Sequence, residues 1–174
     1  MEKRIALVAH DSRKQELKEW VDYNKDILKD CVLYATGTTG TILQECFLVE
    51  ETTEEQDDND LLPVEKMLTI DVQPVYTNTI NRLHSGPLGG DQEIGAMIAN
   101  RKIDVVIFFC DNLITQGHTQ DIQALSRLAS LYNVAYANNR TTADMIITSP
   151  LFFDPNYEMK MPPCIEKYAT RFSK

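Results

Sequence analysis

A threonine- and glycine-rich segment at residues 36–40, T-G-T-T-G, has the composition of an anion-binding turn. It offers closely spaced backbone N–H groups, up to three hydroxyls and the start of a helix, and such oriented donors suit a phosphate. The segment is neither a Walker A loop nor a G-x-G-x-x-G fingerprint, both of which are absent from the chain. Ordinary strand-to-helix turn chemistry would explain the same residues, so the segment alone leaves both interpretations open.

A second loop, S-G-P-L-G-G-D at residues 85–91, has three glycines in five positions. Glycines allow the backbone to approach a ligand closely, and Asp91 follows where a helix is expected to begin. An aspartate that caps a helix after a flexible loop is the plainer interpretation of the same pattern. The loop therefore marks Asp91 as a candidate without assigning it a role.

The three histidines, His10, His84 and His118, are too dispersed along the chain to be read as metal ligands. His118 lies in a polar stretch with Asp111 and Asp121 on either side. Neighbouring carboxylates can tune an imidazole, which makes His118 a candidate acid or base, although an exposed histidine would fit the same stretch.

Apolar runs alternate with amphipathic segments along the chain. Short continuous apolar runs are typical of strands buried on both faces, and they occur at residues 5–9, 31–35, 105–109 and 134–136. A further short strand is expected to lead into Ser85. Apolar residues at helical spacing predict helices after residues 12, 41, 91 and 141 and across 122–132.

Strands that alternate with helices predict a parallel sheet covered on both faces. We expect residues 1–174 to form a single doubly wound, Rossmann-like α/β domain with a mostly parallel sheet. In such a sheet, ligands bind beyond the carboxyl ends of the strands. His10 with Asp11, the segment 36–40 and Asp111 each follow an expected strand, so they are expected to face one site.

An acidic insertion at about 47–79 is expected to interrupt this alternation of strands and helices. Seven acidic residues and no base lie between residues 50 and 60, which accounts for most of the net charge of −9. The acidic part has the composition of a solvated loop, and residues 67–76 could form a hairpin. We expect the insertion to be peripheral to the chemistry.

Composition excludes several classes of protein. With 43% hydrophobic and 25% charged residues, the chain is of ordinary globular type, and no apolar run approaches the length of a membrane span. The sequence shows no cluster of basic residues of the kind that binds a nucleic acid. Four cysteines without a C-x-x-C pair argue against a zinc site or a disulfide framework, so we expect reduced thiols in a cytoplasmic protein.

Taken together, these segments resemble the methylglyoxal synthase family. The matching stretches, in order, are I-A-L-V-A-H-D with Lys14 three residues later, V-L-Y-A-T-G-T-T-G, L-x-S-G-P-L-G-G-D-Q-x-I-G-A, K-I-D-V-V-I-F-F and T-A-D-x-I-I-x-S-P. They span nearly the whole chain apart from the insertion. Each stretch is weak alone, whereas their combined order and spacing are specific.

The resemblance implies a carbon–oxygen lyase that converts dihydroxyacetone phosphate to methylglyoxal and inorganic phosphate without a metal or organic cofactor. It implies that Asp91 is the catalytic base and that His10 and His118 contact the carbonyl and hydroxyl end of the substrate. Asp11, Asp111 and Asp121 would orient the histidines and Lys14. The implied phosphate site consists of Lys14, Thr36, Gly37, Thr38, Thr39, Ser85 and Gly86.

The resemblance also implies a homo-oligomer, specifically a hexamer, in which inorganic phosphate acts as product and inhibitor. A non-catalytic module of the same fold that binds a phosphate ligand is the alternative. Asp91 together with two histidines favours the enzyme, because a binding module needs no positioned base. A cyclohydrolase-like enzyme acting on a nucleotide is disfavoured, because the loops match the synthase pattern instead.

Overall fold

The computed structural model describes residues 2–49, 75–114, 117 and 119–171. Within these residues one sheet runs in the order β3-β2-β1-β4-β5, and every neighbouring pair of strands is parallel. The strands are β1 (Arg4–Ala9), β2 (Val32–Thr36), β3 (Ile80–Leu83), β4 (Val105–Phe109) and β5 (Ala135–Ala137). The predicted doubly wound α/β fold is confirmed.

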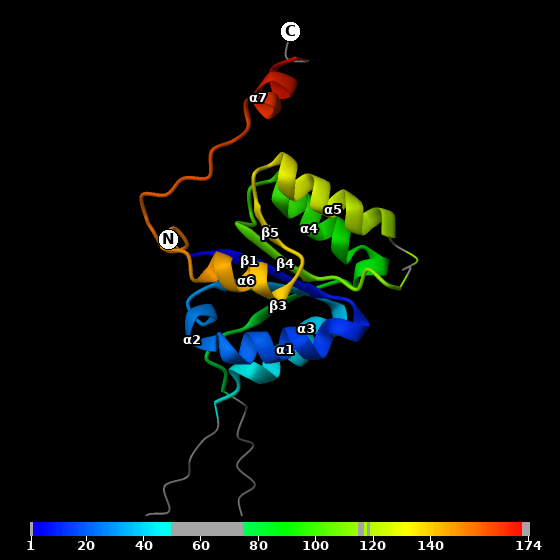
Figure 1. The fold of residues 1–174 in the computed structure, drawn as a ribbon, viewed down its shortest axis with the longest axis vertical. Helices are drawn as coiled ribbons and strands as arrows, with labels where there is room; N and C mark the ends of the chain where they lie inside the picture. Colours follow the sequence, from blue (N-terminus) through cyan, green and yellow to red (C-terminus); the bar gives the residue numbers. More distant parts are fainter. Residues whose placement is uncertain (1, 50–74, 115–116, 118, 172–174) are drawn as a thin grey trace, which may run out of the picture.

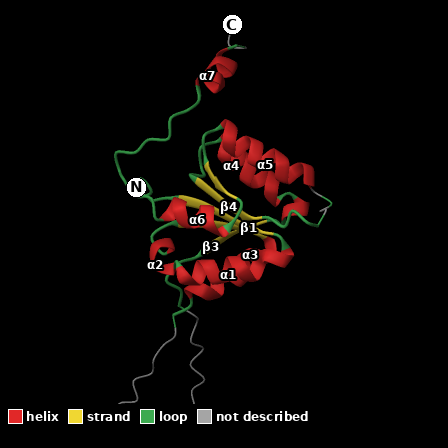
Figure 2. Cartoon of the chain, in the orientation of Figure 1, coloured by secondary structure: helices red, strands yellow, loops and turns green. Residues whose placement is uncertain are grey.

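Helices cover both faces of the sheet, so the body has three layers (Figures 1 and 2). One face carries α4 and α5, and the other carries α1, α3 and α6. The α-helices are α1 (Lys14–Tyr23), α2 (Lys25–Leu28), α3 (Gly37–Gln44), α4 (Gly90–Ala99), α5 (Thr119–Leu131), α6 (Arg140–Ile147) and α7 (Pro163–Thr170). Short 3-10 turns are η1 (Asp11–Arg13), η2 (Glu45–Phe47) and η3 (Gly86–Leu88).

The alternation of side chains along the strands separates two hydrophobic cores. In β1, Ile5 and Leu7 pack toward α1, whereas Ala6 and Val8 pack toward α4 and α5. All four side chains are buried, as a strand covered on both faces requires. The two cores hold the sheet rigidly beneath the loops that follow its carboxyl ends.

Local helix boundaries differ from the sequence prediction in two places. The helix after residue 12 is interrupted at Asn24, whose side-chain amide donates to the Trp20 carbonyl oxygen, and it resumes as α2. Helix α3 begins at Gly37, four residues earlier than expected. The segment 36–40 is therefore the first turn of a helix, and Thr36 occupies its N-cap position.

The chain segments before and after the acidic run lie close together. Leu48 and Tyr76 form an antiparallel bridge, flanked by hydrogen bonds from the Val49 N–H to the Val75 carbonyl (2.7 Å) and from the Thr77 N–H to the Phe47 carbonyl (2.7 Å). Residues 50–74, which include the acidic run and most of the expected hairpin, lie outside the described residues. The bridge therefore brings together the segment that follows η2 and the segment that precedes β3.

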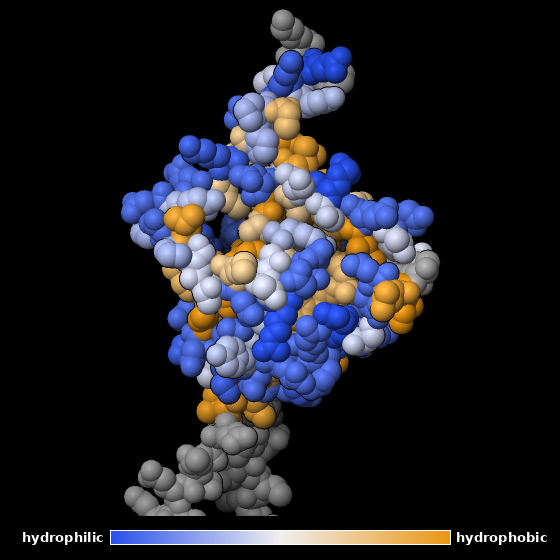
Figure 3. Space-filling view, viewed as in Figure 1, coloured by the Kyte–Doolittle hydropathy of each residue, from blue (hydrophilic) through white to orange (hydrophobic). Residues whose placement is uncertain are grey.

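The face shown in Figure 3 is mostly hydrophilic, with hydrophobic side chains exposed in several separate places, one of them just below α7. Helix α7 was not predicted, and it stands away from the body at the end of an extended arm (Figure 1). None of the helices described here is both long and apolar enough to cross a bilayer.

Candidate active site

A pocket of about 660 Å³ opens at the carboxyl ends of the strands. Parallel strands bring their carboxyl ends to one edge, so residues far apart in the sequence share this pocket. Of the residues singled out from the sequence, those that line it are His10, Asp11, Lys14, Thr36, Gly37, Thr38, Thr39, Ser85, Gly86, Asp91 and Asp121. One residue of the predicted set, His118, lies outside the described residues. Asp111 lines a neighbouring hollow together with His10.

Asp91 is almost completely buried, with 2% of its surface exposed. Gly89 adopts a left-handed conformation (φ 110°) and occupies the N-cap position of α4, so Asp91 lies inside the first turn and does not cap the helix. A Cβ at Gly86 would lie 3.1 Å from each Asp91 carboxylate oxygen. The glycine thus lets the loop pass directly over the carboxylate, as a base facing a small substrate would require.

The amino terminus of α3 and Lys14 form the cationic side of the pocket. The Lys14 ammonium donates to the Thr38 hydroxyl (2.5 Å) and pairs with the Asp11 carboxylate (2.5 Å). Hydrogen bonding to Lys14 holds the pKa of the Asp11 carboxyl below its ordinary value. Backbone N–H groups of the first turn of α3 add positive potential beside this ammonium, and the two together suit a phosphate.

A close contact joins the two candidate phosphate loops. A Cβ at Gly37, whose φ is +41°, would lie 2.7 Å from the Ser85 Cβ. Any side chain at Gly37 would therefore push the loops apart as well as strain the backbone. Glycine at this position lets the two loops lie against each other at the wall of one pocket.

The hydrogen bonding of His10 selects one tautomer of its ring. The backbone N–H of Asp111 donates to His10 Nδ1 over 2.8 Å, and a backbone N–H can only donate. Nδ1 must therefore be unprotonated, which makes the ring neutral and places its proton on Nε2. His10 is buried and lines the pocket, so this arrangement suits it to donate a hydrogen bond to a carbonyl oxygen.

Ser12 braces the residue that sets this tautomer. Its hydroxyl donates to Asp111 Oδ2 over 2.6 Å, while Asp111 Oδ1 accepts the Leu113 N–H over 3.0 Å. These bonds hold the pKa of the Asp111 carboxyl below its ordinary value, and the bond from Ser12 has the largest effect. Neither Ser12 nor Asp11 occupies an N-cap position, since His10 precedes η1 and Arg13 precedes α1.

Replacing Ser12 with alanine is expected to lower kcat/KM about two- to tenfold, because an exposed hydrogen bond to a charged group is lost and the Asp111 loop loosens against His10. Steady-state kinetics measure the loss. The ¹⁵N shifts of the His10 ring should report a larger fraction of Nδ1 protonation. Unchanged kinetics and shifts would show that Ser12 does not act through His10.

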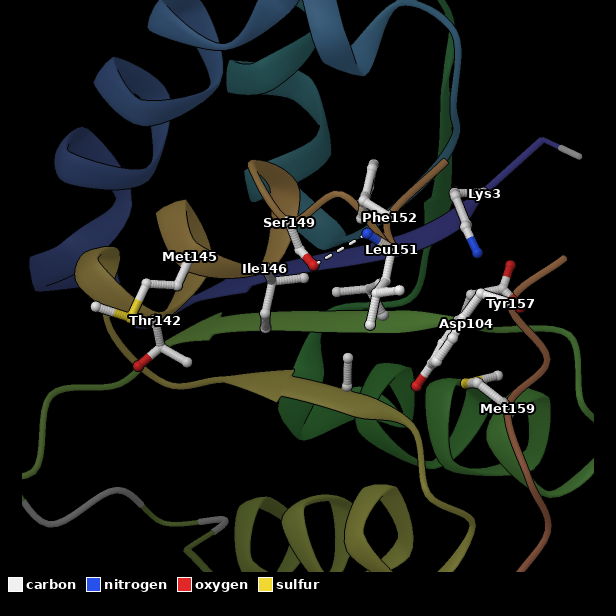
Figure 4. Close-up of a pocket in the computed structure, with 12 residues that line it drawn as sticks. Lys3, Asp104, Thr142, Met145, Ile146, Ser149, Leu151, Phe152, Tyr157 and Met159 are labelled. Carbon is white, nitrogen blue, oxygen red and sulfur yellow. Dashed lines mark hydrogen bonds between the residues drawn. The ribbon is translucent and has the colours of Figure 1, made fainter. Parts of the chain in front are cut away.

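A second pocket, of about 290 Å³, lies at the opposite, amino ends of the strands. Figure 4 shows Ile146 of α6 beside Leu151, whereas Met145 lies at one end of the pocket and Tyr157 and Met159 lie at the other. Its lining is mainly apolar, and it contains none of the candidate site residues. The pocket at the carboxyl ends is therefore the better candidate for the chemistry.

Sequence reasoning missed two polar residues that form hydrogen bonds beside the candidate site, Ser12 and Glu93. Glu93 lies two residues after Asp91 and bonds back to His84. No local pattern distinguishes these residues from ordinary surface residues, because their partners are set by the tertiary fold.

The T-A-D stretch at 142–144 has a structural role, since Asp144 accepts the Trp20 indole N–H over 2.7 Å. Among the described residues, no group of three or more His, Cys, Asp or Glu side chains could hold a metal ion.

Comparisons with known proteins agree with this geometry. A family model, the MGS-like domain, matches residues 65–138. A methylglyoxal synthase of Maridesulfovibrio salexigens is 45% identical over 158 residues, which cover 91% of this chain and 90% of the relative. A methylglyoxal synthase of Coxiella burnetii is 40% identical over 169 residues, covering 97% of this chain and 96% of the relative.

The chain belongs to the methylglyoxal synthase family. The crystal structure of a methylglyoxal synthase from Elizabethkingia anophelis matches the fold with a TM-score of 0.72 and 36% identity, covering 98% of this chain and 91% of that one. Family membership therefore extends over nearly the whole chain and includes the loops that line the pocket.

Proposed function

We propose that this chain, like the methylglyoxal synthases it matches, converts dihydroxyacetone phosphate to methylglyoxal and inorganic phosphate. The observation that carries the proposal is the buried carboxylate of Asp91, which shares one pocket with a neutral His10 and an anion-binding helix terminus. Such a pocket offers a base, a hydrogen-bond donor for a carbonyl oxygen and a phosphate cradle. We place the reaction in the cytoplasm, where triose phosphates are produced.

In the proposed reaction, Asp91 removes a proton from the hydroxymethyl carbon next to the carbonyl. The Nε2–H of His10 stabilises the developing enediolate oxygen, and we assign the same end of the substrate to His118 on the family pattern. Triosephosphate isomerase begins with the same step, using a glutamate and a neutral histidine. Proton abstraction alone therefore does not decide the product.

Elimination follows when the electron pair of the enediolate expels phosphate from the neighbouring carbon. The C–O bond to phosphate must stand out of the enediolate plane for this step. We assign that constraint to the cradle of Lys14, residues 36–39, Ser85 and Gly86. The enol left behind takes up a proton at its new methylene carbon, which gives methylglyoxal, and no oxidant, reductant or organic cofactor is needed.

Incubation with dihydroxyacetone phosphate tests the proposal. Methylglyoxal and inorganic phosphate should appear in equal amounts, and added phosphate should inhibit, because it occupies the cradle. Folded protein that binds phosphate and yields neither product would favour the alternative, a non-catalytic phosphate-binding module. Phosphate release without methylglyoxal would indicate a phosphatase instead.

We also propose a homo-oligomer, a hexamer on the family pattern, with cooperative inhibition by phosphate. Exposed apolar side chains on the C-terminal segment support association, among them Leu151, Phe153 and Tyr157. Sedimentation analysis with and without phosphate measures the assembly. A monomer at micromolar concentration that is fully active would contradict the proposal.

We propose that the chain is one domain with a peripheral insertion at about 47–79. Because Leu48 and Tyr76 already bring its ends together, shortening the loop between them changes the closure entropy only modestly. Deleting residues 52–60 should therefore leave kcat within about threefold of the parent. Loss of activity in a correctly folded and assembled deletion variant would make the segment part of the active site.

A further inference from the structure

The backbone of His84 lies where three parts of the candidate site meet. His84 follows β3 and precedes Ser85, and its carbonyl oxygen accepts the Gly37 N–H over 3.2 Å. A Cβ at Gly90 would lie 2.1 Å from the same oxygen, so the start of α4 packs directly on it. The position of His84 therefore sets the spacing between the first turn of α3, the Ser85 loop and the helix that carries Asp91.

One carboxylate holds His84 from outside the pocket. Glu93 Oε2 accepts the His84 backbone N–H over 2.9 Å, and Glu93 Oε1 contacts His84 Nδ1 at 2.6 Å. Neither Glu93 nor His84 lines the pocket, and the His84 side chain is mostly exposed (72%) whereas that of Glu93 is partly buried (37% exposed). The two bonds to His84 keep the pKa of the Glu93 carboxyl below its ordinary value, and the bond from the His84 backbone N–H has the larger effect. Glu93 is therefore a charged carboxylate at neutral pH.

We propose that Glu93 is a positioning residue for the phosphate cradle, which it aligns by clamping His84 between the Ser85 loop and α3. The inference rests on the proposed function, because it assumes that Ser85 and Gly86 contact the phosphate group. Phosphate is held by several short hydrogen bonds at once, and a shift of one ångström in such a cradle is costly. Glu93 is in α4, so its carboxylate ties the loop to a packed helix.

The clamp should act on phosphate binding more than on proton abstraction. Asp91 is held by α4 itself, which is anchored through the buried side chains of Ile94 and Ile98. The Glu93 backbone N–H also donates to the Gly89 carbonyl (2.9 Å), and this bond survives any change of side chain. Loss of the carboxylate thus frees the Ser85 loop while leaving the base in place.

Isothermal titration with inorganic phosphate, paired with dihydroxyacetone phosphate kinetics, tests this assignment. Glu93→Ala should raise the phosphate Kd and the substrate KM together by about 5- to 20-fold and change kcat less than about threefold. Glu93→Gln keeps an acceptor for the backbone N–H and should restore both values to within about threefold of the parent. His84→Ala keeps the backbone contact and should weaken binding less than Glu93→Ala does.

The matched control is Glu45→Ala, which removes a glutamate that pairs with Lys18 (2.6 Å) away from the pocket. A Glu93→Ala variant that binds phosphate as Glu45→Ala does would overturn the assignment, as would a loss confined to kcat. If Glu93→Ala does not fold, Glu93→Asp tests the assignment instead. It keeps the negative charge, but its shorter side chain no longer reaches the His84 backbone N–H. Weaker phosphate binding by Glu93→Asp than by Glu93→Gln supports the clamp, and equal binding overturns it.

Phosphate titration also separates this inference from the proposed function. A parent protein that binds phosphate without releasing methylglyoxal would remove the enzymatic proposal, yet the Glu93 series would still measure the clamp. A parent that turns over substrate while every Glu93 variant matches it would leave the enzyme intact and remove the clamp.

Discussion

Replacing Asp91 with asparagine is expected to lower kcat by about 10²- to 10⁴-fold, the range that a positioned general base supplies. Asparagine has nearly the same shape as aspartate, so it fits the buried space beneath Gly86, but its amide cannot take a proton from carbon. Phosphate affinity should persist or rise, because a negative charge leaves an anion-binding pocket. Kinetics, phosphate titration and circular dichroism together measure the three effects.

Asp121→Asn is the informative comparison, because Asp121 lines the same pocket from the first turn of α5. If Asp91 is the base, Asp121→Asn should retain far more activity than Asp91→Asn. A reversed order, or near-normal kcat in Asp91→Asn, would move the base to Asp121 or Asp111.

Replacing Lys14 with glutamine should weaken binding of phosphate and of dihydroxyacetone phosphate by about 10- to 100-fold, since a charge-assisted hydrogen bond is lost. The change also leaves Asp11 without its cationic partner at the mouth of the pocket, so its charge then repels the ligand. The double variant Asp11→Asn/Lys14→Gln should recover part of the affinity. Phosphate titration and substrate KM measure both steps.

Lys18→Gln is the control for this prediction. Lys18 lies one turn further along α1 and pairs with Glu45 (2.6 Å), and it does not line the pocket. Removing it changes the net charge of the chain by the same amount. Equal weakening by both substitutions would mean that long-range attraction, and not a phosphate contact by Lys14, explains the effect.

Much of the architecture follows from local sequence. Continuous apolar runs such as 105–109 can be satisfied only between two layers, so the strands of a parallel sheet are visible in the sequence. Because parallel strands end at one edge, the sequence also predicts that His10, the segment 36–40 and Asp111 face one site. His10 and residues 36–39 line one pocket, whereas Asp111 lines the neighbouring hollow with His10. Family motifs added roles to these residues, which composition and spacing had left open.

Tertiary structure decided the details that depend on contacts between distant residues. Sequence left Asp91 as either a helix cap or a functional group, and the left-handed Gly89 at the N-cap position places it inside the buried first turn. The tautomer of His10 depends on a backbone N–H 101 residues away. Ser12 acquires its role only because the η1 turn lies against the end of β4, where Asp111 begins a loop.

Helix α3 shows the physical reason most plainly. Two glycines and three threonines in the segment 36–40 have poor intrinsic helix propensity, so local preference predicts a turn. In the fold, the Gly37 N–H bonds to His84 and the side of α3 packs through the buried Thr39 and Leu43. Packing and long-range hydrogen bonds outweigh unfavourable propensities of up to about 1 kcal/mol per residue, so only the folded chain determines where this helix begins.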